Sequence, residues 1–393
     1  MGRPFKGSDV RFAIKIAAGW HNANVLSHAF ANNIFSYTIN EMRSIFKIIS
    51  NQFREATVPQ IFLLAVILCG TIVASTAMGY IKLPAADVIK IIMSKLSGRL
   101  SLIDGMDKLF PVVVFDVRLP RILTAALVGS GLAISGVVFQ GILLNPLADP
   151  YTLGVSAGAA FGASLAILLN IGFMGTASVP LFAFIGAVAT LFFVMYLSES
   201  GGGVSSTNLI LSGIIVAAIL SAGISFIKYI ADEQVAVIIF WLMGSFGSKT
   251  WTDVGLTFLF VGCGFLIFMF FARDLNLMSL GDRAASSLGV DTKKVTLTLL
   301  VTASMVAAIC VSVSGIIGFV GLLVPHMMRL LTGPDNRRLI PISFLAGSIL
   351  LLTADTITRA VLPSEIPIGV LTALIGGPFF CYIFRKQQKT RNQ

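Results

Sequence analysis

Charged side chains are scarce in this chain of 393 residues, because Asp, Glu, Lys and Arg together make up only 12%. A soluble protein carries about 25% charged residues, so the composition excludes an ordinary soluble domain. Hydrophobic residues make up 56% and gather in runs of about 18 or more, long enough to cross a hydrocarbon core about 30 Å thick. The composition therefore predicts an all-α, polytopic membrane protein.

Cysteine and histidine are also rare, with four and three residues. His21 and His28 have no third ligand near them in the sequence, and two ligands alone are a weak sign of metal or haem binding. The cysteines read as small core residues, because they lie inside apolar runs without the paired spacing of a disulfide framework or zinc site: Cys69, Cys263, Cys310 and Cys381. No metal site is expected in this chain.

Ten apolar segments predict about ten transmembrane helices. They cover residues 58–79, 120–143, 152–171, 178–198, 207–228, 251–272, 294–314, 317–331, 340–355 and 367–384. The apolar segment 235–247 is too short to span a membrane, so it predicts a re-entrant or surface helix. We expect a cytoplasmic, partly amphipathic N-terminal extension at 1–57, a transmembrane domain at 58–386 and a cytoplasmic tail at 387–393.

Acidic residues are outnumbered by Lys and Arg, 18 against 28, so the net charge is +10. The basic residues are dispersed over the ends of the apolar segments, so nucleic acid is not an expected partner. Lys and Arg concentrate in the cytoplasmic loops of membrane proteins, and this rule favours both chain ends in the cytoplasm. The loop before the second span breaks the rule, because it places Arg118 and Arg121 on the outer side.

Arg118 and Arg121 bracket a Leu-Pro dipeptide where the second span begins. Proline is favoured in the first helical turn, so the motif predicts a helix start with guanidinium groups at the membrane edge. A third arginine, Arg359, falls near the outer end of the ninth span, four residues after Asp355. That spacing predicts an ion pair on one helical face. The arginines on their own are also compatible with ordinary membrane anchors.

The sequence Asn-Pro-Leu-Ala-Asp-Pro at 145–150 predicts a tight reversal between the second and third spans. Pro146 and Pro150 make the turn rigid, and Asn145 and Asp149 can accept backbone N–H groups at turns and helix caps. We assign this turn an architectural role, fixing the angle between two helices.

Small residues are concentrated in the second and third spans. Glycine at such positions lets two helix backbones approach closely. The glycines expected to serve helix packing are Gly129, Gly136, Gly154, Gly158 and Gly162.

The loop between the sixth and seventh spans has an amphipathic pattern that predicts two short helices. Its apolar face needs a surface to cover it, and the bundle itself or the lipid headgroups are one possibility. The residues concerned are Leu277, Leu280, Gly281, Ala284, Ala285, Leu288 and Gly289.

Several of these motifs together resemble the FecCD-type permeases, the membrane subunits of ATP-driven importers for ferric siderophores, haem and cobalamin. The similarity rests on residues 118–158 with the turn just described, the loop 277–291, and the elements at 315–329 and 365–369. It implies the type II ABC importer permease architecture. It also implies a location in the bacterial inner membrane, with some of the glycines bordering the translocation path.

The resemblance further implies partners and residue roles. Two permease copies, most simply a homodimer, would work with two cytoplasmic ATPases and one extracytoplasmic solute-binding protein. ATP and Mg would be bound by the ATPase subunits, so this chain would need no cofactor and no catalytic residue. Arg118, Arg121 and Arg359 would receive carboxylates of the binding protein, because the guanidinium fork grips a carboxylate with two hydrogen bonds. Arg118→Glu would then weaken docking and leave folding intact.

In the same family the loop 277–291 corresponds to the helix pair that sits in a cleft of the ATPase and transmits its closure. Ala285→Glu is accordingly expected to uncouple ATP hydrolysis from transport.

Ferric siderophore is the first expected cargo, with haem and cobalamin as alternatives, because the spans show no acidic cluster for a bare cation. A different class, an ion-coupled secondary carrier, would need buried acidic or histidine residues midway along spans, and the sequence shows no convincing relay. An integral membrane enzyme is disfavoured, because no nucleophile–base pair appears.

Overall fold

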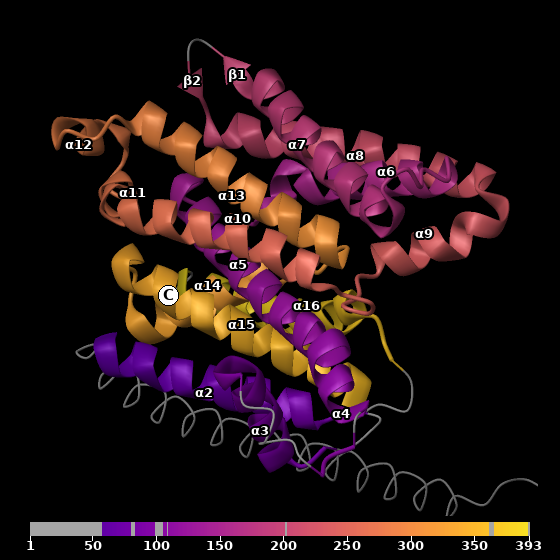
Figure 1. Ribbon diagram of the computed structural model, residues 1–393. Helices are drawn as coiled ribbons and strands as arrows, with labels where there is room; N and C mark the ends of the chain where they lie inside the picture. The colour runs from indigo at the N-terminus through magenta and orange to yellow at the C-terminus, as the bar shows by residue number, and fades with distance from the viewer. Residues whose placement is uncertain are drawn as a thin grey trace, which may run out of the picture. The chain divides into compact units, whose positions relative to one another are not determined.

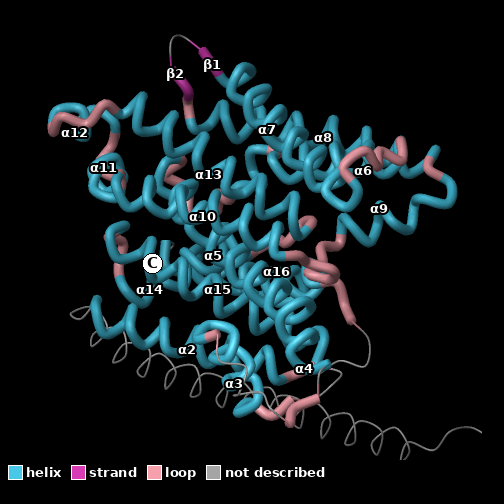
Figure 2. The backbone as a smooth tube through the Cα atoms, in the orientation of Figure 1, coloured by secondary structure: helices cyan, strands magenta, loops and turns pink. Residues whose placement is uncertain are grey.

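The computed structural model describes residues 57–79, 83–98, 105–107, 109–200, 203–360 and 365–391. The expected N-terminal extension lies outside these residues, apart from Thr57. Within them the chain is helical, with one short antiparallel hairpin of β1 (Glu199–Ser200) and β2 (Gly203–Val204). The predicted all-α class is confirmed (Figures 1 and 2).

Each of the ten predicted spans coincides with a helix that is long or apolar enough to belong to a membrane bundle. Seven are long: α2 (Thr57–Ala77), the continuous segment Leu109–Ile142 that ends in α5 (Leu119–Ile142), α7 (Ser178–Ser198), α8 (Ser206–Ile230), α10 (Trp251–Phe270), α13 (Thr292–Ser314) and α15 (Asn336–Ala360). Three are shorter or only partly apolar: α6 (Val155–Leu168), α14 (Val320–Thr332) and α16 (Ile368–Arg391). The last helix continues through residues expected to form the tail.

The remaining helices are short. They are α3 (Ala85–Ser97), α4 (Leu109–Val112), η2 (Val113–Arg118), η3 (Pro150–Leu153), η4 (Gly175–Ala177), η5 (Asp232–Gln234), α9 (Val235–Leu242), α11 (Ala272–Met278) and α12 (Asp282–Ser287). Helix α9 lies in the segment that predicted a short non-spanning helix. The sequence did not predict α3, because its 13 residues carry few apolar positions in a row.

Helix α5 forms the centre of the bundle, where it packs against α15, α13, α10 and α14. It can be surrounded because most of its positions are Gly, Ala, Ser or branched aliphatic residues, and nearly all of them are buried. Peripheral helices instead carry exposed apolar side chains, such as Ile219 and Phe226 on α8. Exposed apolar surface on long helices is the arrangement expected for contact with lipid.

The loops fall at two ends of the bundle (Figure 1). One end carries α4 and α9, and we call it the α9 end. The opposite end carries α11, α12 and the β1–β2 hairpin, and we call it the α12 end. Because each spanning helix connects the two ends, Arg121 and Glu365 come together at the α9 end, although they lie far apart in the sequence.

Candidate functional site

Four charged side chains from three parts of the chain form a cluster at the α9 end. Arg121 donates from Nε and Nη2 to Asp355, with Nη2 2.9 Å from Oδ1. Its Nη1 lies 3.2 Å from Oε1 of Glu365. Asp355 also faces Arg359, whose Nε lies 3.5 Å from Oδ2, so the predicted pair four residues apart is confirmed. Asp355 is only 1% exposed, whereas the Glu365 side chain is 60% exposed.

Arg118 and Arg359 bind the C-terminal end of α2. Arg118 Nη1 donates to the carbonyl of Thr76 at 2.5 Å, and Arg359 donates to the carbonyls of Met78, at 2.6 Å, and Ser75. The last carbonyls of a helix lack intrahelical partners and carry partial negative charge, so cations at this end are favourable. Both guanidinium groups are therefore largely buried between α2 and its neighbours.

This geometry changes the result expected for Arg118→Glu. A carboxylate at this position would face the carbonyl oxygens of α2 in a buried site. We therefore expect the substitution to weaken the attachment of α2, so it cannot be a clean probe of docking. Arg121 instead has an exposed side chain, Glu365, among its partners.

A cavity of about 240 Å³ lies beside the charged cluster. Arg121, Asp355 and Glu365 line it together with two aromatic residues, Phe240 of α9 and Phe246 of the following loop. The cavity places a partly neutralised guanidinium next to apolar walls. Such a site can accept an acidic side chain that carries its own aliphatic stem.

The turn at 145–150 uses the predicted acceptors. Asn145 Oδ1 accepts the N–H of Leu147 at 3.0 Å, and Asp149 Oδ1 accepts the N–H groups of Tyr151 and Thr152 at 3.1 and 3.0 Å. Asp149 is the N-cap of η3, and buried Pro150 begins that helix. The predicted capping roles of Asn145 and Asp149 are confirmed, whereas Pro146 is exposed.

Burial raises the pKa of Asp149 to about 6, although its two backbone hydrogen bonds act in the opposite direction. Because this folded-state pKa exceeds the usual unfolded value of about 3.9, the associated stability is present below about pH 4 and is lost as the pH rises through 6. Asp149→Asn keeps the acceptor without the charge. We expect its melting temperature, measured on detergent-purified protein, to gain on the wild type from pH 4 to pH 7.

Asp149→Ala is the matched control, because it also lacks the carboxyl but removes the cap, so it should be about 1 kcal/mol less stable than Asp149→Asn at every pH. Parallel pH profiles for wild type and Asp149→Asn would show that the carboxyl group titrates normally.

The glycines of α5 lie where other helices cross it. A side chain at Gly129 would overlap the carbonyl of Gly347 on α15, and one at Gly136 would overlap the carbonyl of Gly321 on α14. Gly347 faces Gly129 in the same way, so the two backbones touch directly. These crossings depend on the absence of Cβ on both helices.

The glycines of the third span also lie where other segments approach the helix closely. Gly158 and Gly186 of α7 face each other, and a side chain at Gly162 would meet the carbonyl of Phe182. Gly154 has φ +75°, a conformation that favours glycine, at the start of α6. All five predicted glycines thus lie against other segments of this same chain.

Helices α11 and α12 differ in exposure. Leu275 and Met278 of α11 are buried in the bundle, and Leu277 is partly buried. Gly281 has φ +96° between the two helices and Gly289 has φ +89° after them, so these glycines end the short helices as the spacing predicted.

The outer face of α12 carries Ala284, while Leu280 just before the helix and Leu288 just after it are 64% and 57% exposed. Ala285 is 0% exposed and packs inward. Ala285→Glu would therefore bury a charge and disturb folding. A substitution at the exposed Ala284 tests the outer face of α12 instead.

A polar cluster that the sequence did not reveal joins α11 to the turn before α15. Asn276 Nδ2 donates to Asp335 Oδ1 at 2.6 Å, and Asn276 Oδ1 accepts from the backbone and side-chain N–H groups of Asn336 at 2.9 and 2.8 Å. The partners lie about sixty positions apart in the sequence, a separation that no local pattern can bridge. Displacement of α11 would therefore pull directly on α15.

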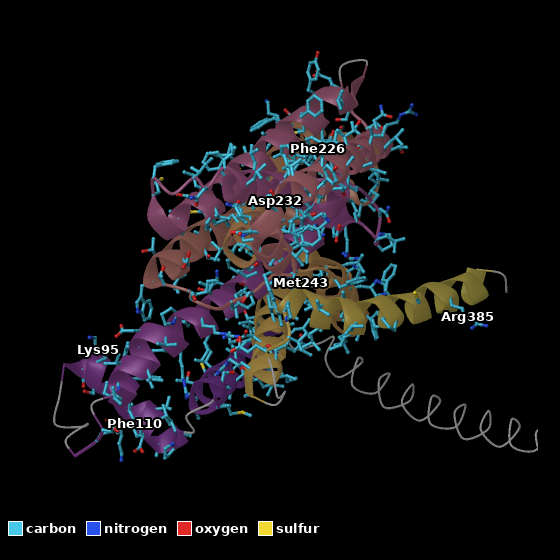
Figure 3. The ribbon with its side chains drawn as sticks, turned by 90° about the vertical axis from the view of Figure 1, so that its right-hand side faces the viewer. Lys95, Phe110, Phe226, Asp232, Met243 and Arg385 are labelled. Carbon is cyan, nitrogen blue, oxygen red and sulfur yellow. The ribbon has the colours of Figure 1, made fainter. Side chains whose placement is uncertain are left out.

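An apolar groove of about 590 Å³ lies at the α9 end beside the start of α16 (Figure 3 labels Met243 there). Its lining residues are Leu242, Met243, Ile316, Gly318, Gly369, Val370, Ala373, Leu374 and Pro378. Among the residues that the structure describes, no group of three His, Cys, Asp or Glu side chains could hold a metal ion.

Comparison with known proteins gives concordant matches. Residues 61–386 match the FecCD transport family. The chain is 41% identical over 285 residues to the cobalamin import system permease of Halobacterium salinarum, covering 72% of this chain and 76% of that protein. It is 38% identical over 333 residues to the molybdate import system permease of Haemophilus influenzae, covering 84% and 96%.

A solved structure described as an inward-facing conformation of a metal-chelate type ABC transporter superimposes with a TM-score of 0.71 at 34% identity. It covers 84% of this chain and 100% of that one.

Proposed function

The chain belongs to the FecCD transport family, which makes it the permease of an ATP-binding-cassette importer, and we propose that it moves a chelated metal of the ferric-siderophore class inward. Haem and cobalamin are the alternative cargoes within the same family. The relatives are named for solutes as different as cobalamin and molybdate, so family membership alone does not select the cargo.

The apolar groove beside α16 is the observation that favours a chelated metal over a bare ion as cargo. A bare cation would need several oxygen ligands, and a small oxyanion would need hydrogen-bond donors. The groove is instead lined by aliphatic side chains, glycine and proline. An organic chelate brings its own metal ligands and presents apolar surface outward, which matches this lining.

The two ends of the bundle suit different partners. The exposed surface of Leu280, Ala284 and Leu288 at the α12 end is the proposed contact with the ATPase, which binds ATP and Mg. Arg121 at the α9 end is the proposed contact with the solute-binding protein. The chain then lies in the bacterial inner membrane with both termini in the cytoplasm, and two copies form the pathway between them.

Uptake by the reconstituted complex tests this proposal. Liposomes would contain the permease with its cognate ATPase, and would receive the binding protein with a ferric siderophore, haem or cobalamin. We expect uptake of the ferric siderophore only when ATP is present. Uptake that follows an ion gradient without ATP would instead establish a secondary carrier, and ATP-driven uptake of haem or cobalamin alone would reassign the cargo.

Within the same assay, Ala284→Glu is expected to reduce uptake at least tenfold, because it places a charge on the face proposed to enter the ATPase cleft. Its melting temperature should stay within about a degree of the wild type, since exposed substitutions change stability by about 0.5 kcal/mol or less. Ser287→Glu is the control, because Ser287 is also exposed on α12. Normal uptake by Ala284→Glu would remove this surface from the ATPase contact.

A further inference from the structure

The charged cluster at the α9 end contains two carboxylates that differ in burial and in their partners. Asp355 is buried and contacts both Arg121 and Arg359. Glu365 is exposed, contacts Arg121 alone among these arginines, and lies after the end of α15. Glu365 can therefore separate from Arg121 into solvent, whereas the buried Asp355 cannot leave its two arginines.

The two edges of the Arg121 guanidinium have different occupants. Asp355 takes the edge formed by Nε and Nη2, with a shortest distance of 2.9 Å. Glu365 faces Nη1 at 3.2 and 3.3 Å and Nη2 at 3.4 Å. Charge-assisted hydrogen bonds of this kind are about 2.7–2.9 Å when strong. The contact with Glu365 is therefore longer than a strong pair, and because Glu365 is exposed it is readily replaced.

From this geometry, and resting on the proposed function, we infer that Glu365 is a built-in occupant of the docking face of Arg121, which an acidic side chain of the solute-binding protein displaces. The incoming carboxylate enters the cavity of about 240 Å³ that Arg121 and Glu365 line. Phe240 and Phe246 form apolar walls there for the stem of the incoming side chain.

The charge balance favours this exchange. Arg121 and Arg359 supply two positive charges, and Asp355 and Glu365 supply two negative ones, so these four side chains are balanced while Glu365 stays in place. When Glu365 swings into solvent, the surface presented to the partner becomes more positive. Complementary charge increases association rates and fixes the docking register. Before docking, Glu365 satisfies Arg121 and disfavours nonspecific capture of other anions.

Glu365→Gln tests the inference, because it removes the competing charge and keeps the size of the side chain. The affinity of the reconstituted permease–ATPase complex for its binding protein would be measured by surface plasmon resonance at several salt concentrations. We expect the affinity to rise about 1.4- to fivefold, the range given by the 0.2–1 kcal/mol of an exposed ion pair. The salt dependence should become steeper, since one more positive charge faces the partner.

Glu233→Gln is the matched control. Glu233 is exposed in η5 close to α9, so the substitution makes the same change in net charge at the same end, and its affinity should change less than that of Glu365→Gln. The double variant Arg121→Gln/Glu365→Gln should show no gain over Arg121→Gln, because the effect acts through Arg121.

Three outcomes would overturn the inference. An unchanged affinity for Glu365→Gln would make Glu365 a bystander, and a reduced affinity would make it a direct contact with the binding protein. If wild-type permease binds no cognate solute-binding protein at all, the proposed importer function fails first and the inference fails with it.

Discussion

Asp355→Ala is expected to prevent accumulation of folded protein, the largest single effect that the structure predicts. The substitution leaves Arg121 and Arg359 facing each other at a buried site without the carboxylate that both contact. Removing one partner of a buried ion pair typically costs about 3–5 kcal/mol. The thermal unfolding midpoint of detergent-purified protein, together with the yield of monodisperse protein, measures this loss.

Glu365→Ala is the control for Asp355→Ala, because it removes the other carboxylate from the same Arg121. Since Glu365 is 60% exposed, its removal should cost less than about 1 kcal/mol. Equal destabilisation by the two substitutions would mean that burial of Asp355 contributes nothing beyond an ordinary surface pair.

Gly136→Ala should separate α5 from α14. The new Cβ would overlap the carbonyl carbon and oxygen of Gly321, which belong to the backbone and cannot rotate away. Overpacking of this kind typically costs about 1–3 kcal/mol, and more when backbone must move. We expect a lower melting temperature and, because α5 is the central helix, at least a severalfold loss of transport.

Gly262→Ala is the matched control for Gly136→Ala. Gly262 also lies inside a long apolar helix, α10, but a Cβ there would meet no atom within 4 Å. Alanine is the better helix former by up to about 1 kcal/mol, so this variant should be as stable as the wild type or more so. A similar loss in both variants would show that backbone flexibility, and not helix contact, explains these glycines.

The spanning helices could be read from the sequence because lipid imposes a simple requirement. A segment that crosses the membrane must be helical and apolar over its length, and all ten predicted segments coincide with helices. The capping roles of Asn145 and Asp149 were also readable, because a cap bonds to backbone only two or three residues away.

Helix α3 escaped prediction because it is short and amphipathic, so polar residues interrupt its apolar residues along the sequence. Its buried positions, Val88 and Ile91, find partners in the segment around Val114 and Leu119. A search for long apolar runs in the sequence does not detect such a helix.

The sequence also could not predict which residues within a motif are exposed and which are buried. Ala284 and Ala285 are adjacent and identical in chemistry, yet one faces outward and the other is fully buried against the bundle. Arg118 and Arg121 belong to one motif, yet the first binds the end of α2 and the second binds two carboxylates.

The sequence by itself determined the membrane class, the helical spans, the local turns and the family, because each of these depends on residues that are near neighbours or on a shared motif. Tertiary structure alone decided which residues meet, as Arg121 meets Glu365 from 244 positions away and Asn276 meets Asn336. Helix packing sets those contacts through the rotation and crossing of whole helices, and local sequence patterns contain no information about either.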